Sequence, residues 1–371
     1  MNREQLASAK RIVIKVGSST LTGSAGSALD ESSVNSLADL IAHLRSQGKE
    51  VVLVSSGAIA AGLAPLGLTT RPKDLATQQA AASVGQGLLV ARYTESFKRH
   101  NVIASQVLLT IEDVIRRSHY QNAQRTLFKL IQLGVVPVIN ENDSVGTQEI
   151  RFGDNDRLAA LVSHLIGADL LVLISDIDAL YDAPPSQSGA KRIAHVASLA
   201  ELADAKVGGA GAAGVGSGGM LTKIEAARIA TGAGITMFLT SLPHLSEAIT
   251  GSDVGTTFAP VHDKKPSRLL WLEHASTPRG RLILDAGATT AILERGVSLL
   301  PAGVTAVEGE FNSGDTVELI GASGVVIARG LVAFDSEEIP QMLGRSTKEL
   351  AQSLGAEYER ELVHRDDLVL I

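Results

Sequence analysis

The sequence predicts an α/β protein in which helices cover both faces of a mainly parallel β-sheet, followed by a small β-rich domain. Over roughly the first 240 residues, short β-branched runs alternate with stretches of helical period. Near Asp263 this alternation stops, and short segments separated by turn signals follow. A chain of 371 residues also exceeds one ordinary core, which indicates at least two domains.

The strands of the predicted sheet are Ile12–Val16, Val51–Val54, Val135–Ile139, Leu170–Ile174 and Ile235–Leu239. Between them lie helical stretches, of which Val34–Gln47 has its apolar residues on one face and Gly48 as a stop signal. Similar stretches run over about Tyr120–Leu133, Asp156–Ile166 and Thr222–Thr231. Because ligands bind beyond the carboxyl ends of parallel strands, a functional site is expected in the loops that follow these strands.

The C-terminal part differs in pattern and in charge. Residues 263–280 are polar, contain Pro266 and Pro278, and are predicted to be a linker between a domain over 1–262 and one over 281–371. The second domain is expected to hold short strands and one helix near Ala286–Arg295. From Gly280 to Ile371 the chain has 7 Lys and Arg against 15 Asp and Glu, a balance of −8.

Composition excludes several classes of function. With no cysteine, thiol catalysis, disulfides and cysteine-based zinc sites are ruled out, and the nine histidines show no metal-binding spacing. Aromatic residues make up only 3%, so stacking surfaces for single-stranded nucleic acid are scarce. The polar N-terminus lacks a signal-peptide core, and no apolar run is long enough to span a membrane, so we expect a cytoplasmic protein with no membrane partner.

Two lysines lie in loops suited to bind phosphate. Lys15 ends the first strand and is followed by Gly17 and two serines, which supply backbone N–H groups and hydroxyls beside a positive charge. The plain alternative is a lysine that extends from a sheet edge into solvent. Lys223 follows the glycine-rich tract Gly208–Gly219 and lies in the first turn of a predicted helix.

Three further loops are polar. Ser55–Ala58 precedes a helix start that would attract an anion, unless a serine there only caps the helix. Asn140–Asp143 and Gly153–Arg157 could bind the carboxylate and ammonium of an amino acid, orient lysines or help hold Mg²⁺, or they could be solvated turns. Ser175–Tyr181 suits a nucleotide base or ribose, with a hydrated turn as the alternative.

Some familiar motifs are absent or incomplete. Gly214–Gly219 fits G-x-G-x-x-G but lacks the strand that must precede it in a dinucleotide site. Gly48-Lys49 is followed by glutamate, which excludes a P-loop. His364-Arg-Asp366 lies at the chain end without the downstream asparagine of a protein-kinase catalytic loop, and no G-x-S-x-G elbow occurs.

The segments KVGSS, SSGAIAAG, VVPVINEND, GDND, ISDIDALY and SGGMLTK occur in the order found in the amino acid kinase superfamily. Over about residues 10–262 the chain resembles this superfamily, and within it the glutamate 5-kinases most closely. The segment DAGATTAILERGVSLLPAGV resembles the PUA domain that many bacterial members carry. The resemblance implies a three-layer α/β/α sandwich that uses ATP with Mg²⁺ to convert L-glutamate into L-glutamyl 5-phosphate.

The resemblance also implies roles for individual residues. The residues implied to act in catalysis are Lys15, Lys223 and Asp156, with Asp156 orienting the lysines. Those implied to bind glutamate are Ser56, Asp143 and Asn155. Those implied to line the nucleotide are Lys15, Gly17, Ser175, Asp176, Ser217, Gly218, Gly219, Met220, Leu221, Thr222 and Lys223. Relatives often have threonine where this chain has Ser18, Ser175 and Ser217, which keep the hydroxyl.

The partners implied by the resemblance are proline as an inhibitor, a glutamyl phosphate reductase as the next enzyme of proline synthesis, and further copies of the chain in a homo-oligomer. Kinases for acetylglutamate, aspartate, carbamate or UMP are the alternatives within the superfamily. An RNA-binding role through the C-terminal domain is an alternative of another class, and the acidic balance of that domain argues against it.

Overall fold

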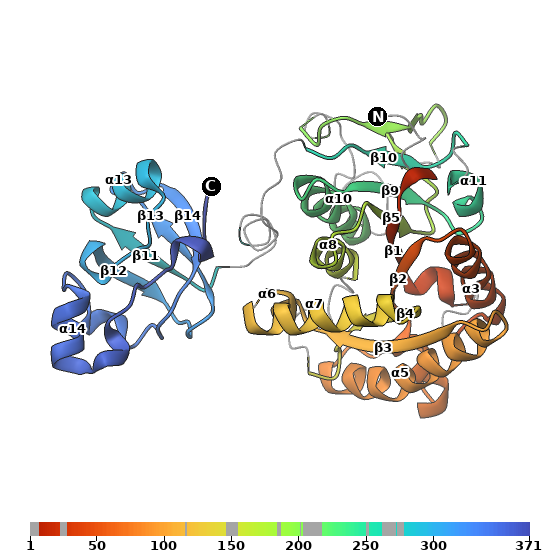
Figure 1. Cartoon of the computed structure of the whole chain (residues 1–371), viewed down its shortest axis with the longest axis horizontal. Coiled ribbons are helices and arrows are strands. Elements are labelled where there is room, and N and C mark those ends of the chain that lie inside the picture. The colour runs from red at the N-terminus through yellow and green to blue at the C-terminus, as the bar shows by residue number, and fades with distance from the viewer. Residues whose placement is uncertain are drawn as a thin grey trace. The chain divides into compact units, whose positions relative to one another are not determined.

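The computed structural model describes residues 7–22, 28–115, 117–145, 155–183, 187–200, 202, 217–249, 252–261, 272 and 278–371. The chain divides into two compact units, Met1–Lys264 and Lys265–Ile371, here called the N-terminal and C-terminal units (Figure 1). Most of the linker predicted over 263–280 lies outside the described residues. None of the helices in the described ranges combines the length and apolar character needed to cross a lipid bilayer.

The N-terminal unit is built on an eight-stranded sheet in the order β3-β4-β2-β1-β5-β9-β10-β8. The strands are β1 (Arg11–Val16), β2 (Glu50–Ser55), β3 (Ile103–Leu109), β4 (Val135–Glu141), β5 (Leu170–Ile174), β8 (His195–Val196), β9 (Thr236–Thr240) and β10 (Thr256–Phe258). All neighbouring strands pair in parallel except β9 and β10. The prediction of a mainly parallel sheet is therefore confirmed.

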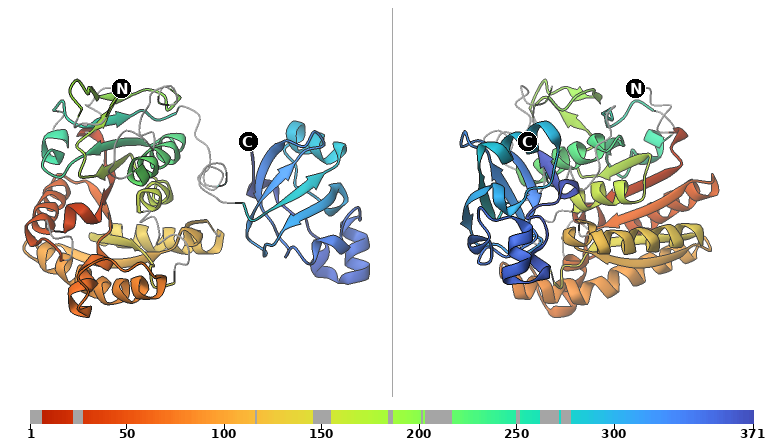
Figure 2. Two further views of the ribbon diagram at one scale, coloured as in Figure 1. Left: turned by 180° about the vertical axis from the view of Figure 1, so that it is seen from behind. Right: turned by 60° about the vertical axis from the view of Figure 1, so that its left-hand side comes forward.

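Helices flank this sheet on both faces (Figure 1 and Figure 2). Ile12, Ile14 and Val16 of β1 pack in one core with residues of α3 (Glu31–Ser46), α5 (Leu75–Lys98) and α11 (Leu245–Ile249). Side chains alternate across a strand, so Lys15 faces the other side. That side is covered by α7 (Arg117–Gln132), α8 (Asn155–Leu165) and α10 (Ser217–Gly232).

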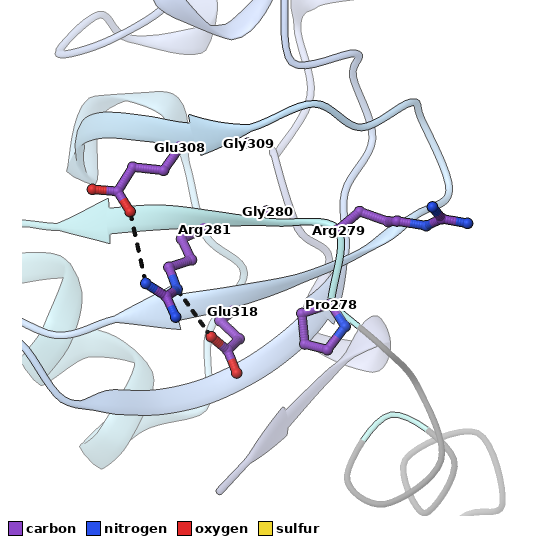
Figure 3. A pocket seen from close by; sticks show the side chains of 7 residues that line it. All are labelled: Pro278, Arg279, Gly280, Arg281, Glu308, Gly309 and Glu318. Atoms are coloured by element: carbon purple, nitrogen blue, oxygen red, sulfur yellow. Dashed lines mark hydrogen bonds and ion pairs between the residues drawn. The ribbon is translucent and has the colours of Figure 1, made fainter.

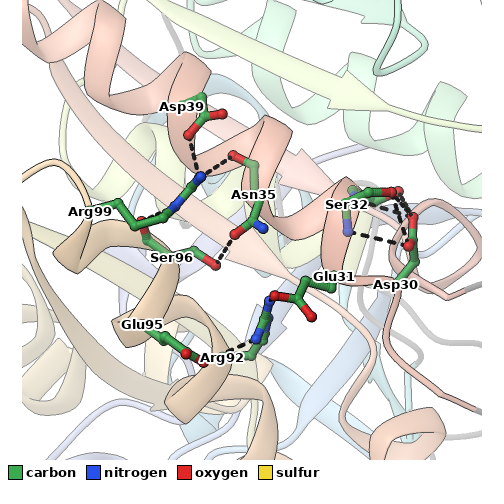
Figure 4. Close-up of polar contacts among 10 residues, drawn as sticks. Asp30, Glu31, Ser32, Asn35, Asp39, Arg92, Glu95, Ser96 and Arg99 are labelled. Atoms are coloured by element: carbon green, nitrogen blue, oxygen red, sulfur yellow. Dashed lines mark hydrogen bonds and ion pairs between the residues drawn. The ribbon is translucent and has the colours of Figure 1, made fainter.

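The helix predicted over Val34–Gln47 begins earlier than its apolar pattern indicates. Its N-cap is Asp30, whose carboxylate accepts hydrogen bonds from the backbone N–H groups of Ser32 and Ser33 (Figure 4). These bonds satisfy two donors that the first turn of a helix leaves free. The helix therefore starts at Glu31, three residues before the first core residue, Val34.

Two elements of the N-terminal unit go beyond those predicted. Helix α5 is 24 residues long, but Val84 and Leu88 are exposed while Leu89, Tyr93 and Phe97 are buried, so no single apolar stripe marks it. Strand β3 lies at the edge of the sheet and mixes polar with apolar residues. No local sequence pattern predicts either element, because each depends on packing against its neighbours.

The C-terminal unit has a separate five-stranded sheet in the order β12-β11-β13-β14-β15. Its strands are β11 (Gly280–Leu284), β12 (Val304–Gly309), β13 (Thr316–Ile320), β14 (Val326–Leu331) and β15 (Leu368–Leu370). Helix α13 spans Ala286–Arg295 and confirms the helix expected there. A second helix, α14 (Thr347–Leu354), corrects the expectation of one; Ser346 and Glu349 form its capping box.

A row of alternating charges crosses the C-terminal sheet. Glu308, Arg281, Glu318 and Arg329 are successive neighbours on β12, β11, β13 and β14. Arg281 Nε lies 3.2 Å from Glu318 Oε2 (Figure 3), and on the next strand Arg329 Nη2 lies 3.4 Å from Glu318 Oε1. The row borders an open hollow of about 430 Å³ that contains none of the residues predicted to form a site. Each arginine here is paired with a carboxylate, as opposite charges on neighbouring strands favour.

Candidate active site

Lys15, Asp156 and Lys223 meet at the carboxyl end of the N-terminal sheet. Lys15 is the next-to-last residue of β1, Asp156 lies in the first turn of α8, and Lys223 lies in the second turn of α10. Lys15 Nζ is 2.6 Å from Asp156 Oδ1, and Lys223 Nζ is 3.2 Å from Asp156 Oδ2. The structure thus brings together two lysines that are 208 positions apart, with one carboxylate between them.

These three side chains form a buried group with a net charge of +1. Asp156 is 3% and Lys15 5% exposed. Burial raises the pKa of Asp156, but the charges of Lys15 and Lys223 and hydrogen bonds from Lys15 and Thr222 outweigh it, so the pKa falls to about 2. Asp156 is therefore ionised at neutral pH, and one positive charge is left for an anion.

A second polar group adjoins the first, because Asn155 immediately precedes Asp156. Asn155 Nδ2 donates to Ser56 Oγ at 2.8 Å and to Asn140 Oδ1 at 2.9 Å. Asn140 Nδ2 donates in turn to Gln86 Oε1 at 2.8 Å. Side-chain amides therefore join the ends of β2 and β4 to the start of α8. Ser56 and Asn155, which were both predicted to bind the acceptor, lie in direct contact.

Neither serine of the loop after β2 caps a helix. The helix that follows, α4 (Ala58–Leu63), has Gly57 at its N-cap with no side-chain hydrogen bond. Ser55 Oγ instead contacts the hydroxyl of Tyr93 at 2.8 Å, and Ser56 Oγ accepts from Asn155. The alternative that Ser55–Ala58 is only a capped turn is wrong.

Asp143 lies in the turn after β4, two residues beyond the end of that strand. Burial raises its pKa to about 6, against the opposing effect of the Arg71 guanidinium. A carboxyl group with this pKa changes charge close to neutrality. Arg71, from the segment between α4 and α5, is a neighbour that no sequence pattern indicated.

The residues predicted to line the nucleotide lie on the loops after β1 and β5 and on α10. A side chain added at Gly17 would come within 3.6 Å of Lys15 Nζ and 3.9 Å of the carbonyl oxygen of Ile174, which ends β5. Ser175 follows directly and donates from Oγ to Asp176 Oδ1 at 2.8 Å. The segment predicted from the SGGMLTK motif forms the start of α10, and comprises Ser217, Gly218, Gly219, Met220, Leu221, Thr222 and Lys223.

Thr222 and Lys223 attach this start of α10 to Asp156. Thr222 Oγ1 donates to Asp156 Oδ2 at 2.9 Å, and Lys223 Nζ also donates to the carbonyl oxygen of Gly219 at 3.1 Å. The preceding part of the glycine-rich tract, over 208–216, lies outside the described residues, as does Gly153-Asp154. Within the described ranges, no group of three histidine, aspartate or glutamate side chains could hold a metal ion.

Two functional neighbours of the site were not indicated by the sequence. Gln86 and Tyr93 reach the loops after β4 and β2 from α5, the helix that its own pattern does not predict. Both lie on the buried side of α5, seven residues apart, which is a spacing of about two helical turns. The only local signal that could have indicated these two residues was a polar side chain repeated at this spacing.

The chain is similar to known proteins over its whole length. The profile described as "Amino acid kinase family" matches residues 10–241, and that described as "PUA domain" matches residues 280–354. The glutamate 5-kinase of Streptomyces avermitilis is 63% identical over 370 residues, covering 100% of this chain and 98% of the relative. Those of Streptomyces coelicolor and Salinispora arenicola are 59% and 58% identical, each covering 100% of this chain, and 98% and 100% of the relative.

Proposed function

The chain belongs to the amino acid kinase family, in its glutamate 5-kinase branch, and is a kinase; we propose that it phosphorylates the γ-carboxylate of L-glutamate with ATP. The product is L-glutamyl 5-phosphate. The observation that carries this proposal is the group at Asp156, where one buried carboxylate holds two ammonium groups at the carboxyl end of the sheet.

The reaction is an in-line transfer. An oxygen of the γ-carboxylate forms a bond to the γ-phosphorus while the bond from that phosphorus to the β–γ bridging oxygen breaks, and the electron pair leaves with ADP. A carboxylate is already ionised at neutral pH, so no general base is required. What the enzyme must supply is alignment of two anions and compensation of their charge, which is how phosphoryl transfer is mainly catalysed.

Lys15 and Lys223 supply that compensation. Asp156 keeps both ammonium groups in place before ATP arrives, so little reorganisation is needed during transfer. Because Asp156 is engaged by two lysines, Mg²⁺ would enter with the phosphates of ATP and would supply further positive charge to compensate theirs. Gly17, Ser175, Asp176 and the start of α10 from Ser217 line the nucleotide.

The acceptor is bound by the loops after β2 and β4 and the start of α8. Ser56 and Asn155 are joined to each other, and Asp143 supplies a carboxylate for the ammonium group of the substrate. This polar set favours a free amino acid over acetylglutamate, carbamate or UMP, which lack a free α-ammonium. Aspartate also has a free α-ammonium and is the alternative acceptor. Contacts with the α-carboxylate and the α-ammonium cannot distinguish it from glutamate, because the two differ only in the length of the side chain.

Regulation and pathway follow from the same proposal. The acyl phosphate product is a labile mixed anhydride, so an enzyme that reduces it, a glutamyl phosphate reductase, is the expected next partner. We propose further that the reaction is the first step of proline synthesis, that proline inhibits it and that the chain forms a homo-oligomer.

The test is an ATP-dependent hydroxamate assay, in which hydroxylamine traps the acyl phosphate. L-Glutamate should give product, N-acetyl-L-glutamate should give none, and added proline should lower the rate. Product from N-acetyl-L-glutamate or L-aspartate in preference to L-glutamate would overturn the assignment of the acceptor. A rate that does not respond to proline would overturn the proposed regulation alone.

A further inference from the structure

We propose that Gln86 is a positioning residue that fixes which atom of Asn155 is presented to the acceptor, and thereby helps select a free amino acid. The inference rests on the proposed function and deepens it. Gln86 contacts Asn140, which in turn contacts Asn155, so Gln86 itself does not touch the acceptor and has no catalytic role. Its place on α5 connects the helix on one face of the sheet to the acceptor loops.

The contacts form a single chain of amide groups. Gln86 Oε1 accepts from Asn140 Nδ2 at 2.8 Å, Asn140 Oδ1 accepts from Asn155 Nδ2 at 2.9 Å, and Asn155 Nδ2 also donates to Ser56 Oγ at 2.8 Å. Gln86, Asn140 and Asn155 are 8%, 2% and 5% exposed, so water cannot readily replace any member of the chain.

A backbone group fixes the direction of this chain. The N–H of Glu141 donates to Asn140 Oδ1 at 2.9 Å, and a backbone N–H can only donate. A rotation of the Asn140 amide by 180° would place its NH₂ group against two donors, the N–H of Glu141 and Nδ2 of Asn155. The orientation of Asn140 is therefore determined by chemistry, and the acceptor that Gln86 provides holds the other end of that amide.

The consequence appears at Asn155. Asn155 Nδ2 donates its hydrogen bonds to Asn140 and Ser56. The other end of the same amide, Asn155 Oδ1, is a buried oxygen with no hydrogen-bond partner among the described residues. It can accept from the α-ammonium of an amino acid. Ser56 Oγ accepts from Asn155, so its own proton is left to donate to the α-carboxylate. One acceptor and one donor side by side complement the two α-groups of a free amino acid.

Packing does not explain a glutamine at position 86. Its Nε2 is buried without a hydrogen-bond partner among the described residues, which costs stability that an apolar side chain on α5 would not lose. The position is surrounded along the helix by residues without charge, from Leu75 to Ala91. Among the described residues, the one hydrogen bond of the Gln86 side chain is the one it accepts from Asn140 Nδ2, and it holds that amide in the orientation that the N–H of Glu141 requires.

The experiment compares two substitutions of Gln86 with one control. Gln86→Leu removes the acceptor for Asn140 at similar volume, whereas Gln86→Glu keeps an oxygen acceptor in either protonation state. The matched control is Ser96→Ala, because Ser96 is also buried on α5, lies ten residues beyond Gln86, and donates from Oγ to Asn35 of α3 (Figure 4). Steady-state kinetics with L-glutamate and with ATP, and thermal unfolding, are measured for each.

Gln86→Leu should raise KM for L-glutamate about tenfold, the effect of one mispaired buried amide, while kcat and KM for ATP change far less. Gln86→Glu should restore KM towards that of the parent. Ser96→Ala should lower the unfolding temperature without moving KM. If Gln86→Leu lowers the unfolding temperature like the control and leaves KM for the acceptor unchanged, Gln86 is only structural and the inference is wrong.

The proposed function can fail separately. If the parent chain prefers another amino acid as acceptor, the assignment of glutamate falls, and the same comparison of KM is made with that acceptor. If Gln86→Leu raised only the KM for that acceptor, the role of Gln86 would still be supported. If that KM did not rise, the role would be overturned.

Discussion

Asp156 decides the chemistry of the site at the scale of single residues. A buried carboxylate without partners would be protonated more easily, yet two lysines lower its pKa to about 2. Its contribution to stability is therefore present above the pKa of an unfolded aspartate and is lost only as pH falls towards 2. The lysines are held in turn by this charge, so the carboxylate and the two ammonium groups keep one another in place.

Lys223 is expected to matter for the rate more than for binding of the acceptor. Under the proposed function its ammonium faces the charge that develops on the transferring phosphoryl group, while Ser56 and Asn155 bind the acceptor. Lys223→Ala should lower kcat about 10²–10³-fold, the usual cost of one charge-stabilising donor, with a small change in KM for L-glutamate. Steady-state kinetics check this, and near-normal turnover would contradict the role given to Lys223.

Protonation of Asp143 should lower kcat/KM for L-glutamate on the acid side of its pH profile. Its pKa in the free enzyme is raised to about 6, so below this pH it becomes neutral and no longer attracts the substrate ammonium. For the unmodified chain, kcat/KM for L-glutamate should fall about tenfold for each pH unit below pH 6. Asp143→Asn should have a low kcat/KM that no longer changes there. A fall that persists in Asp143→Asn would assign it to another group.

Helix α5 shows how an element remote from the phosphate site shapes the acceptor site. Besides Gln86, it carries Tyr93, whose hydroxyl contacts Ser55 Oγ at 2.8 Å, and Ser55 Oγ donates to the carbonyl oxygen of Ser56 at 2.9 Å. The short helix α4, which begins two residues after Ser56, packs directly on α5. The loop after β2 is thus attached to α5 directly through Tyr93 and indirectly through α4.

Glycines set the distance between these two helices. A Cβ atom added at Gly85 would lie 1.8 Å from the carbonyl oxygen of Ala58, so Gly85→Ala must move α4. It should destabilise the protein by about 1–3 kcal/mol, as overpacking does, and raise KM for L-glutamate. Thermal or denaturant unfolding and kinetics measure the two effects.

Gly87 on the same helix is the control. Apart from its chain neighbours and the backbone of the helix itself, no atom of the described residues lies within 4 Å of a Cβ added there, so Gly87→Ala should stabilise α5 by about 0.4–1 kcal/mol through the unfolded chain and leave KM unchanged. If both substitutions act alike, the close approach of α4 and α5 is not what positions the loop.

At the scale of the whole molecule, each unit has its own core, and all residues proposed for catalysis belong to the N-terminal unit. The C-terminal unit matches a PUA domain, yet its sequence from Gly280 carries 15 acidic against 7 basic residues. Two of those arginines, Arg281 and Arg329, are paired with Glu318. Few positive charges are left to neutralise phosphates.

The protein should therefore not retain RNA. RNA affinity depends on lysine and arginine side chains that displace counterions, and it weakens as salt rises. Gel shifts with structured RNA at low and at moderate salt should show no bound species. A shift that is present at low salt and weakens as salt increases would contradict this reading of the charge.

Five strands of the sheet, the loops that follow them and both lysines could be predicted from the sequence because their signals are local: apolar runs of strand length, each ending in a polar turn. The break in pattern near Asp263 indicated the second domain in the same way. Helix α5 could not be predicted, since exposed Val84 and Leu88 conceal its buried face.

Lys15 and Lys223, with their serine and glycine neighbours, by themselves predicted an anion site in the loops that follow the strands. Only the tertiary structure decided that both lysines share Asp156, and that Asn155 Nδ2 bonds Asn140 and Ser56 while its Oδ1 has no partner among the described residues. The physical reason is that contacts such as those of Gln86 with Asn140 and of Lys15 with Asp156 join residues 54 and 141 positions apart. Such pairings depend on strand order and on which face each side chain takes, which no local pattern records.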